Sequence, residues 1–266
     1  MPDSEYSTLL FDVRDGVGYI TLNRPDAANA LNAEMAHELM DVALRCEEDP
    51  TVRAVLLNST GKIFCAGGDL KSFAAQPKEM LPTYLKKVTF YLHKAVSRLN
   101  RMKAPVVMAV QGAAGGAGMS LACAGDIVIA AESSRFTMAY TRAGLTPDGS
   151  STYFLPRLVG MRRAMDLALT NRVLSAREAC ELGIVTRVVP DAELMATADG
   201  LAKEFARGPT RSYLGVKRLL AASLGNGLED QMELETEWIA EMGRTADGRE
   251  GIAAFLEKRS PRFKGE

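Results

Sequence analysis

The chain has 266 residues, which is enough to bury a full hydrophobic core without a disulfide or a metal ion to hold it together. Its 32 basic residues nearly cancel its 33 acidic residues, which argues against a highly charged partner such as nucleic acid or an anionic membrane. The four cysteines form no Cys-x-x-Cys pair and there are only two histidines, so we predict neither a metal site nor a redox site.

The amino-terminal residues lack the charged and then apolar pattern of a secretion signal. No apolar run approaches the roughly 18 residues that a membrane-spanning helix needs. We therefore expect a cytoplasmic protein with reduced cysteines and no membrane contact.

Strand-like and helix-like segments alternate over the first 190 residues, which predicts an α/β fold. Short apolar runs predict strands at residues 17–22, 52–58, 106–110, 126–130 and 185–189. Few polar residues interrupt these runs, so we expect a sheet that is buried on both faces.

Helical periodicity predicts one helix over residues 33–47, capped by Asn32, and another over residues 79–102 that Pro82 interrupts early. A capping box, Ser175-Ala-Arg-Glu178, predicts a third helix, which a glycine at position 183 would end.

The pattern becomes wholly helical from residue 191 onward. Apolar residues recur there at helical spacing, with too little sheet nearby to cover them: Leu201, Phe205, Tyr213, Val216, Leu219, Trp238, Ile239, Ile252 and Phe255. We therefore divide the chain into an α/β core, 1–190, and a helical region, 191–266, that packs against another subunit as well as its own core. A helical layer that only closes its own domain explains the periodicity equally well.

Two glycine-rich loops follow predicted strands, at residues 64–70 (FCAGGDL) and 111–119 (QGAAGGAGM). Glycine lets a ligand approach the backbone, and a helix that begins near Gly116 would turn free amides outward, so together the loops can bind an oxyanion. Close packing explains either loop taken singly. Neither loop has the glycine register or the lysine of a nucleotide-binding motif.

Four segments, in this order and at this spacing, resemble the crotonase, or enoyl-CoA hydratase/isomerase, superfamily: LNRPDAANALN (22–32), FCAGGDL (64–70), VQGAAGGAGMSLACAGD (110–126) and GLTPDGSS (144–151). The resemblance covers essentially the whole chain. It implies a crotonase-type ββα spiral core with a C-terminal helical trimerisation region, assembled as a trimer or a dimer of trimers. It also implies an acyl-CoA substrate that brings its own coenzyme A, with no separate cofactor.

The same resemblance implies that the thioester oxygen lies between the backbone amides of Gly68 and Ala117, where preorganised donors stabilise an enolate. It places coenzyme A against three stretches: Asp26, Ala27, Ala28, Asn29 and Ala30; Ala66, Gly67, Gly68, Asp69, Leu70 and Lys71; and Phe263 with Lys264 from a neighbouring subunit. A solvated surface lysine is an equally good interpretation of Lys71 and of Lys264.

Hydratases of this family use two glutamates, and the matching positions here hold Ser120 and Tyr140. Neither side chain is a carboxylate at neutral pH, so the usual hydration mechanism is not expected. Asp148 stands where the family's double-bond isomerases carry an acidic residue, and one carboxylate can both remove and return a proton. As an alternative, Asp148 could simply cap the helix that follows it.

We therefore predict an acyl-CoA isomerase with Asp148 as its proton shuttle and with Tyr140, His93, Met138 and Ser120 lining the acyl pocket. The segment after the second glycine-rich loop is most similar to ring-epoxide isomerases of phenylacetyl-CoA breakdown. Three alternatives stay open: an enoyl-CoA hydratase, a 4-chlorobenzoyl-CoA dehalogenase-like hydrolase with Asp148 as nucleophile beside His93, and a non-catalytic CoA- or RNA-binding homologue.

Overall fold

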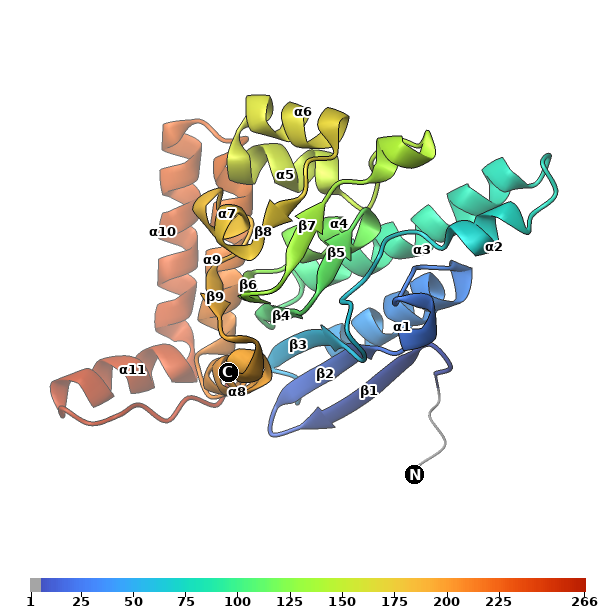
Figure 1. Ribbon diagram of the computed structural model, residues 1–266. Coiled ribbons are helices and arrows are strands. Elements are labelled where there is room, and N and C mark those ends of the chain that lie inside the picture. Colours follow the sequence, from blue (N-terminus) through green and yellow to red (C-terminus); the bar gives the residue numbers. More distant parts are fainter. Residues whose placement is uncertain (1–5) are drawn as a thin grey trace.

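A computed structural model, which describes residues 6–266, contains two sheets surrounded by helices (Figure 1). The larger sheet has the spatial order β1-β2-β3-β4-β6-β9, and the smaller has the order β5-β7-β8. The strands are β1 (Leu9–Arg14), β2 (Val17–Leu22), β3 (Ala54–Ser59), β4 (Val106–Val110), β5 (Ala113–Gly115), β6 (Ile127–Ala131), β7 (Arg135–Thr137), β8 (Leu174–Ser175) and β9 (Arg187–Val189). In the larger sheet β1 runs antiparallel to β2, and all other neighbours are parallel.

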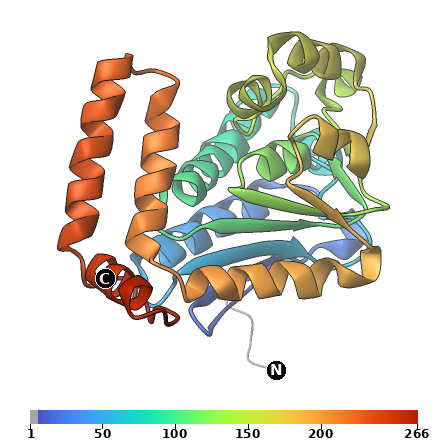
Figure 2. The ribbon, with the colours of Figure 1, turned by 90° about the vertical axis from the view of Figure 1, so that its left-hand side faces the viewer.

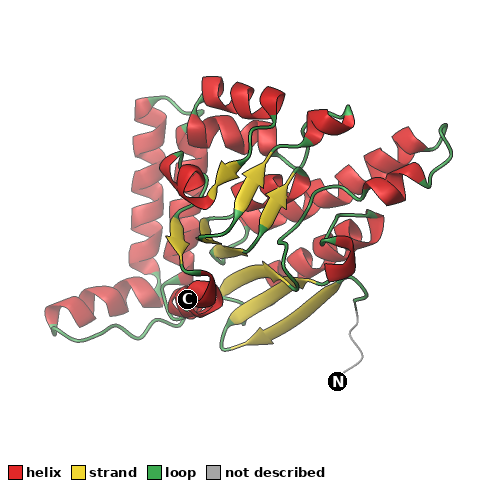
Figure 3. Cartoon of the chain, in the orientation of Figure 1, coloured by secondary structure: helices red, strands yellow, loops and turns green. Residues whose placement is uncertain are grey.

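Helices cover the larger sheet and join its strands (Figure 3). They are η1 (Pro25–Ala27), α1 (Ala33–Glu48), α2 (Leu70–Ala74), α3 (Leu81–Arg101), α4 (Ala117–Cys123), η2 (Tyr140–Ala143), α5 (Ser151–Val159), α6 (Met161–Thr170), α7 (Ala176–Glu181), η3 (Asp191–Glu193), α8 (Leu194–Ala206), α9 (Thr210–Ser223), α10 (Leu228–Arg244) and α11 (Ala246–Leu256). None of the helices within residues 6–266 combines the length and the apolar character needed to cross a membrane.

The larger sheet separates two apolar clusters, because successive side chains of a strand point to opposite faces. In β3, Val55 and Leu57 join the larger cluster, which includes α1 and α3, whereas Ala54 and Leu56 join the smaller cluster. Helix α8 completes that smaller cluster and runs along the sheet in Figure 2. Both faces of the central strands are therefore buried, as their apolar sequences predict.

The structure confirms several local predictions. Strands β2 and β4 have the predicted bounds, and Asn32 caps α1 by accepting a hydrogen bond from the Met35 amide at 2.9 Å. Ser175 and Glu178 form the predicted capping box at the start of α7. The strands expected at 52–58, 126–130 and 185–189 lie at 54–59, 127–131 and 187–189.

Other features of the fold differ from the sequence prediction. Pro82 does not interrupt α3, because it lies in the first turn, where a proline removes no helical hydrogen bond. Strand β1 was not predicted. It is an edge strand, and every second side chain along it is exposed. The short strands β5, β7 and β8 were missed as well, because two or three residues carry no periodicity.

The helical region divides into a part that covers the sheet and a part that extends from it. Leu201 and Phe205 pack on the smaller apolar cluster. Helices α9 and α10 stand beside the body of the molecule in Figure 2, and α11 lies at the foot of α10. Apolar side chains on these helices are strongly exposed: Ile239 is 73% and Phe255 is 84% exposed.

Candidate active site

The two glycine-rich loops lie against each other, one after β3 and one after β4. The Cys65 amide donates to the Ala113 carbonyl at 3.1 Å, and the Gly115 amide donates to the Cys65 carbonyl at 2.9 Å. A Cβ atom at position 118 would lie 2.2 Å from the Cys65 carbonyl oxygen, so only glycine permits this approach. The close packing of the two loops therefore requires this glycine.

A cavity of about 240 Å³ opens beside these loops. It is lined by Leu31, Ala66, Gly67, Gly68, Leu70, Phe73, Leu85, Val88, Thr89, Leu92, Gly116, Ala117, Ala139, Tyr140, Ala143, Leu145, Thr146 and Asp148. In the described part of the chain, neither the Gly68 amide nor the Ala117 amide has a hydrogen-bond acceptor. The cavity therefore combines an apolar wall, two unused backbone donors and one carboxylate.

Asp148 is the carboxylate of this cavity, and its neighbours are hydroxyl groups. Tyr140 Oη donates to Asp148 Oδ1 at 2.7 Å, and Ser120 Oγ lies 2.7 Å from Tyr140 Oη. Burial raises the pKa of Asp148, although the Tyr140 hydrogen bond and the nearby His93 offset part of this rise. Burial, and then the Asp148 charge, also raise the pKa of Tyr140, so this phenol keeps its proton and donates it to the carboxylate.

The turn after Asp148 leads into α5. The Gly149 amide donates to His93 Nε2 at 3.2 Å, and the Ser151 amide donates to the Asp148 carbonyl at 3.1 Å. Ser150 occupies the N-cap of α5 with a φ of 70°, and its side chain makes no capping hydrogen bond. The structure therefore contradicts the alternative that Asp148 is the helix cap, because its carboxylate faces Tyr140 instead.

Of the four side chains predicted to line the acyl pocket, only Tyr140 borders the cavity. Ser120 is fully buried behind it, and Met138 is buried with its carbonyl accepting from the Tyr140 amide at 2.6 Å. His93 lies on α3 and borders a separate cleft of about 860 Å³ between α3, α5, α9 and α10. Ser120 and His93 thus reach the Asp148 turn through hydrogen bonds rather than through the cavity.

Several residues of the cavity wall were not predicted. Leu85, Val88, Thr89 and Leu92 lie at helical spacing on α3 and form one side of the cavity. The signal for them is the amphipathic pattern of that helix, but periodicity alone does not say what its apolar face covers. In the part of the chain that the structure describes, no cluster of three or more His, Cys, Asp and Glu side chains is arranged to hold a metal ion.

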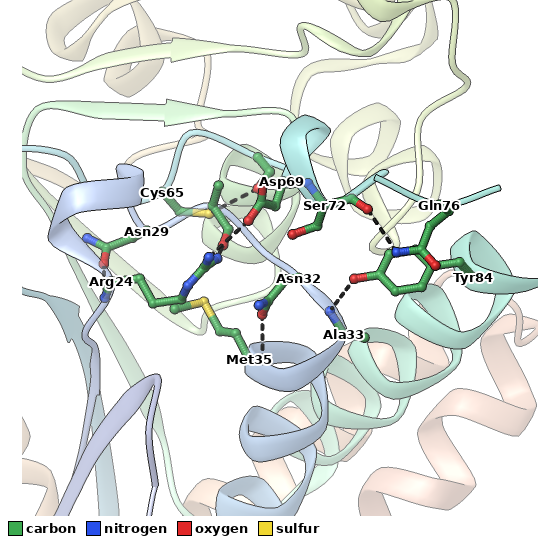
Figure 4. A network of polar contacts seen from close by, with 12 residues as sticks. Arg24, Asn29, Asn32, Ala33, Met35, Cys65, Asp69, Ser72, Gln76 and Tyr84 are labelled. Atoms are coloured by element: carbon green, nitrogen blue, oxygen red, sulfur yellow. Dashed lines mark hydrogen bonds and ion pairs between the residues drawn. The ribbon is translucent and has the colours of Figure 1, made fainter. Parts of the chain in front are cut away.

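The stretch predicted to contact coenzyme A is fixed to the first glycine-rich loop by a polar network (Figure 4). Arg24 pairs with Asp69 at 2.9 Å, and Asp69 caps α2 through the Ser72 amide. Burial would raise the pKa of Asp69, but the Ser72 amide and Arg24 outweigh it and hold this pKa below its usual range. Asn29 is fully buried and donates to the carbonyls of residues 60 and 63.

The predicted coenzyme A contacts fall into three groups. Ala66, Gly67, Gly68 and Leu70 line the cavity. Asp26, Ala27, Ala28, Asn29, Ala30, Asp69 and Lys71 lie in the adjoining segments, where the Ala66 amide donates to the Ala28 carbonyl at 3.0 Å. Phe263 and Lys264 lie outside the cavity lining, near Arg53 and Asp247, so a contact from a neighbouring subunit stays a prediction.

Known proteins resemble this chain over nearly its whole length. The model of the enoyl-CoA hydratase/isomerase family matches residues 12–266. The chain is 42% identical to a 1,2-epoxyphenylacetyl-CoA isomerase of Escherichia coli (strain K12), over 97% of this chain and 98% of that protein.

Relatives with a different name are equally similar. A protein of Rhodobacter capsulatus, named a probable enoyl-CoA hydratase, is also 42% identical, over 98% of this chain and 99% of its own. The crystal structure of an enoyl-CoA hydratase from Polaromonas sp. JS666 superposes with a TM-score of 0.92 at 30% identity, over 97% of this chain and 100% of its own. The chain therefore belongs to the enoyl-CoA hydratase/isomerase family.

Proposed function

We propose that the protein is an acyl-CoA isomerase, in which Asp148 moves a proton between two carbons of a thioester held by the Gly68 and Ala117 amides. One observation carries this proposal: a single carboxylate faces the same apolar cavity as two backbone amides that have no acceptor in the described residues. The coenzyme A portion would extend along the segment that the Arg24–Asp69 pair fixes.

The chemistry needs one base and one oxyanion site. The Asp148 carboxylate would take a proton from a carbon next to the double bond, and the C–H electron pair would move into an enolate on the thioester. The two amides would stabilise the enolate oxygen, each by roughly 3 kcal/mol. The protonated Asp148 would then return the proton to the other end of the system. A raised pKa brings this carboxyl closer to the value that proton transfer at neutral pH requires.

Three features favour isomerisation over the alternatives. Asp148 is the one carboxylate of the cavity lining, so a second acid for water addition is missing from that lining. Ser120 and Tyr140 stand where hydratases of the family carry glutamates; here they bond to each other, and Tyr140 also bonds to Asp148. His93 borders the other cleft and not the cavity, which argues against the dehalogenase-like reaction, in which His93 would act beside a substrate bonded to Asp148.

The substrate that we propose is an unsaturated or ring-derived acyl-CoA. The apolar wall from α3 suits an unsaturated chain or a ring. The similarity to a 1,2-epoxyphenylacetyl-CoA isomerase supports a ring-derived acyl group and a place in phenylacetate breakdown.

We also propose that the protein assembles as a trimer, alone or as a dimer of trimers. The support is the exposed apolar surface of α10 and α11, where Ile239 and Phe255 are 73% and 84% exposed. Light scattering during size-exclusion chromatography would give three or six copies of the chain. A monomeric mass at micromolar concentration would contradict the proposal.

The function is tested by separate incubation with a 3-enoyl-CoA, a 2-enoyl-CoA and 4-chlorobenzoyl-CoA, followed by mass spectrometry and ultraviolet absorbance. Conversion of the 3-enoyl to the 2-enoyl compound without a change of mass would support the isomerase. Gain of water would show hydration instead, and loss of chloride would show the dehalogenase reaction.

A further inference from the structure

Three side chains from separate elements form a continuous chain of hydrogen bonds that runs from the cavity wall into the protein interior. Ser120 comes from α4, Tyr140 from η2, and Asp148 from the turn before α5. Both links in this chain measure 2.7 Å. Ser120 is fully buried and Tyr140 is 8% exposed, so water does not compete freely for either hydroxyl.

The direction of the chain follows from the carboxylate. An ionised Asp148 can only accept hydrogen bonds, so the single proton of Tyr140 must be donated to it. The Tyr140 oxygen is then free to accept, and Ser120 becomes the donor. The hydrogen bond from Ser120 polarises the Tyr140 hydroxyl, and this polarisation strengthens the hydrogen bond that Tyr140 donates to Asp148 Oδ1.

Ser120 also connects this chain to the oxyanion loop. The Gly116 carbonyl, at 3.2 Å, is a second and more distant acceptor for the single Ser120 hydroxyl proton, and the Ser120 amide donates to the same carbonyl at 3.0 Å. That carbonyl belongs to the peptide group whose amide is Ala117. The side chain that supports the base thus also touches the peptide that supplies one of the two unused donors.

We propose that Ser120 and Tyr140 are positioning residues: they hold Asp148 by one carboxylate oxygen, keep it aimed at the cavity, and leave the other oxygen free for the substrate. The catalytic role of these two residues rests on the proposed function. The hydrogen bonds between them and Asp148 are independent of that function. Neither residue needs to touch the reacting atoms for this role.

The pKa of Asp148 depends on the groups that surround its carboxylate. Tyr140 and Ser120 approach from η2 and α4, and His93 approaches from α3, where it accepts from the Gly149 amide. Among the cavity-lining residues, only Tyr140 and Asp148 carry titratable side chains. Loss of the Tyr140 donor removes a hydrogen bond that favours the ionised carboxyl, so the pKa of Asp148 must rise further.

The test compares the intact protein with its Tyr140→Phe, Ser120→Ala and Tyr153→Phe variants. Tyr153 is a matched control, because it is 48% exposed and lies outside the cavity lining. The Asp148 carboxyl is titrated directly by infrared difference spectroscopy, and its band is assigned by its absence in Asp148→Asn. The acid limb of kcat/KM against pH is measured in parallel with a 3-enoyl-CoA.

We expect Tyr140→Phe to raise the pKa of the Asp148 carboxyl and the acid limb by about one unit. Ser120→Ala should shift both in the same direction by less, and Tyr153→Phe should shift neither. An unmoved carboxyl band in a correctly folded Tyr140→Phe variant would overturn the positioning role. A shifted band without any isomerisation in the intact protein would support that role and overturn the proposed function.

Discussion

Two aspartates of the site, the buried Asp69 and the half-buried Asp148, have opposite properties. Asp69 receives the Arg24 guanidinium and the Ser72 amide, and these donors hold its pKa below the usual range despite burial. Among the described residues, the Asp148 carboxylate accepts a hydrogen bond only from the Tyr140 hydroxyl, and burial raises the pKa of Asp148. The well-satisfied carboxylate holds two loops together, whereas the poorly satisfied one remains available to take up a proton.

The comparison predicts that Asp148→Asn will have the largest effect on turnover. An amide cannot accept the substrate proton, so kcat should fall by roughly 10²–10⁴-fold, while affinity for coenzyme A stays nearly constant. Steady-state kinetics with a 3-enoyl-CoA and calorimetric titration with coenzyme A separate the two quantities. A twofold loss of kcat would mean that the base lies elsewhere.

Gly68→Pro should have the next largest effect, because proline has no amide to donate to the enolate. The neighbouring bridge uses the Gly67 carbonyl and the Asp69 amide, so the substitution breaks no backbone hydrogen bond of the fold. We expect kcat to fall by roughly 10²–10³-fold.

Gly68→Ala is the matched control for this change. It keeps the amide and brings the same Cβ contact with the Phe73 ring, 2.8 Å from Cζ before the ring moves. Gly68→Ala should therefore retain most of the turnover. Equal losses in both variants would assign the effect to the Phe73 contact rather than to the missing donor.

Arg24→Met should act on the other aspartate and leave the chemistry intact. It leaves Asp69 buried without its cationic partner, so the free energy of unfolding should fall by about 2 kcal/mol and KM should rise. Urea denaturation and steady-state kinetics measure these changes. The control is Arg14→Met, which breaks an exposed pair with Asp12 and a stacking contact on the Tyr19 ring, and which should lower stability by no more than about 1 kcal/mol. Similar losses in both variants would contradict a special role for Arg24.

The smallest expected effect is a pH-dependent gain of stability in Asp148→Asn. A carboxyl whose pKa is raised by folding destabilises the folded state only where it is ionised. The cost is absent below the unfolded value of about 3.9 and grows as the pH rises through the folded pKa. The variant should therefore gain stability relative to the wild type between pH 4 and pH 8. A constant difference across this range, measured by urea denaturation, would contradict the raised pKa.

Much of the fold could be predicted, namely those elements whose pattern of apolar and capping residues lies within one short stretch of sequence. Strands β2 and β4 were predicted correctly, because a buried parallel strand is apolar along its whole length. The capping box at Ser175 is local in the same sense. Strand β1 was missed because an edge strand is half exposed and mixes polar with apolar residues.

The site was only partly predictable, for a physical reason. The cavity brings Gly68, Ala117, Tyr140 and Asp148 together, as the family motifs imply, and their roles remain predictions. The bond between Ser120 and Tyr140 joins residues on separate elements, so no sequence pattern reports it. The same holds for His93, whose helix places it behind the Asp148 turn and against a different cleft.

The central claim is that one carboxylate, Asp148, moves a proton on an enolate. Its most direct test is incubation of a 3-enoyl-CoA in D₂O with the wild type and with Asp148→Asn, followed by mass spectrometry and NMR of the recovered thioesters. We expect the wild type to shift the double bond and to retain much of the original proton, because Asp148 returns the proton that it removed, with deuterium entering only where the protonated Asp148 exchanges with solvent before the return. Asp148→Asn should not shift the double bond at a comparable rate. An equal rate of double-bond shift by both proteins, or addition of water by the wild type without a shift of the double bond, would contradict the account.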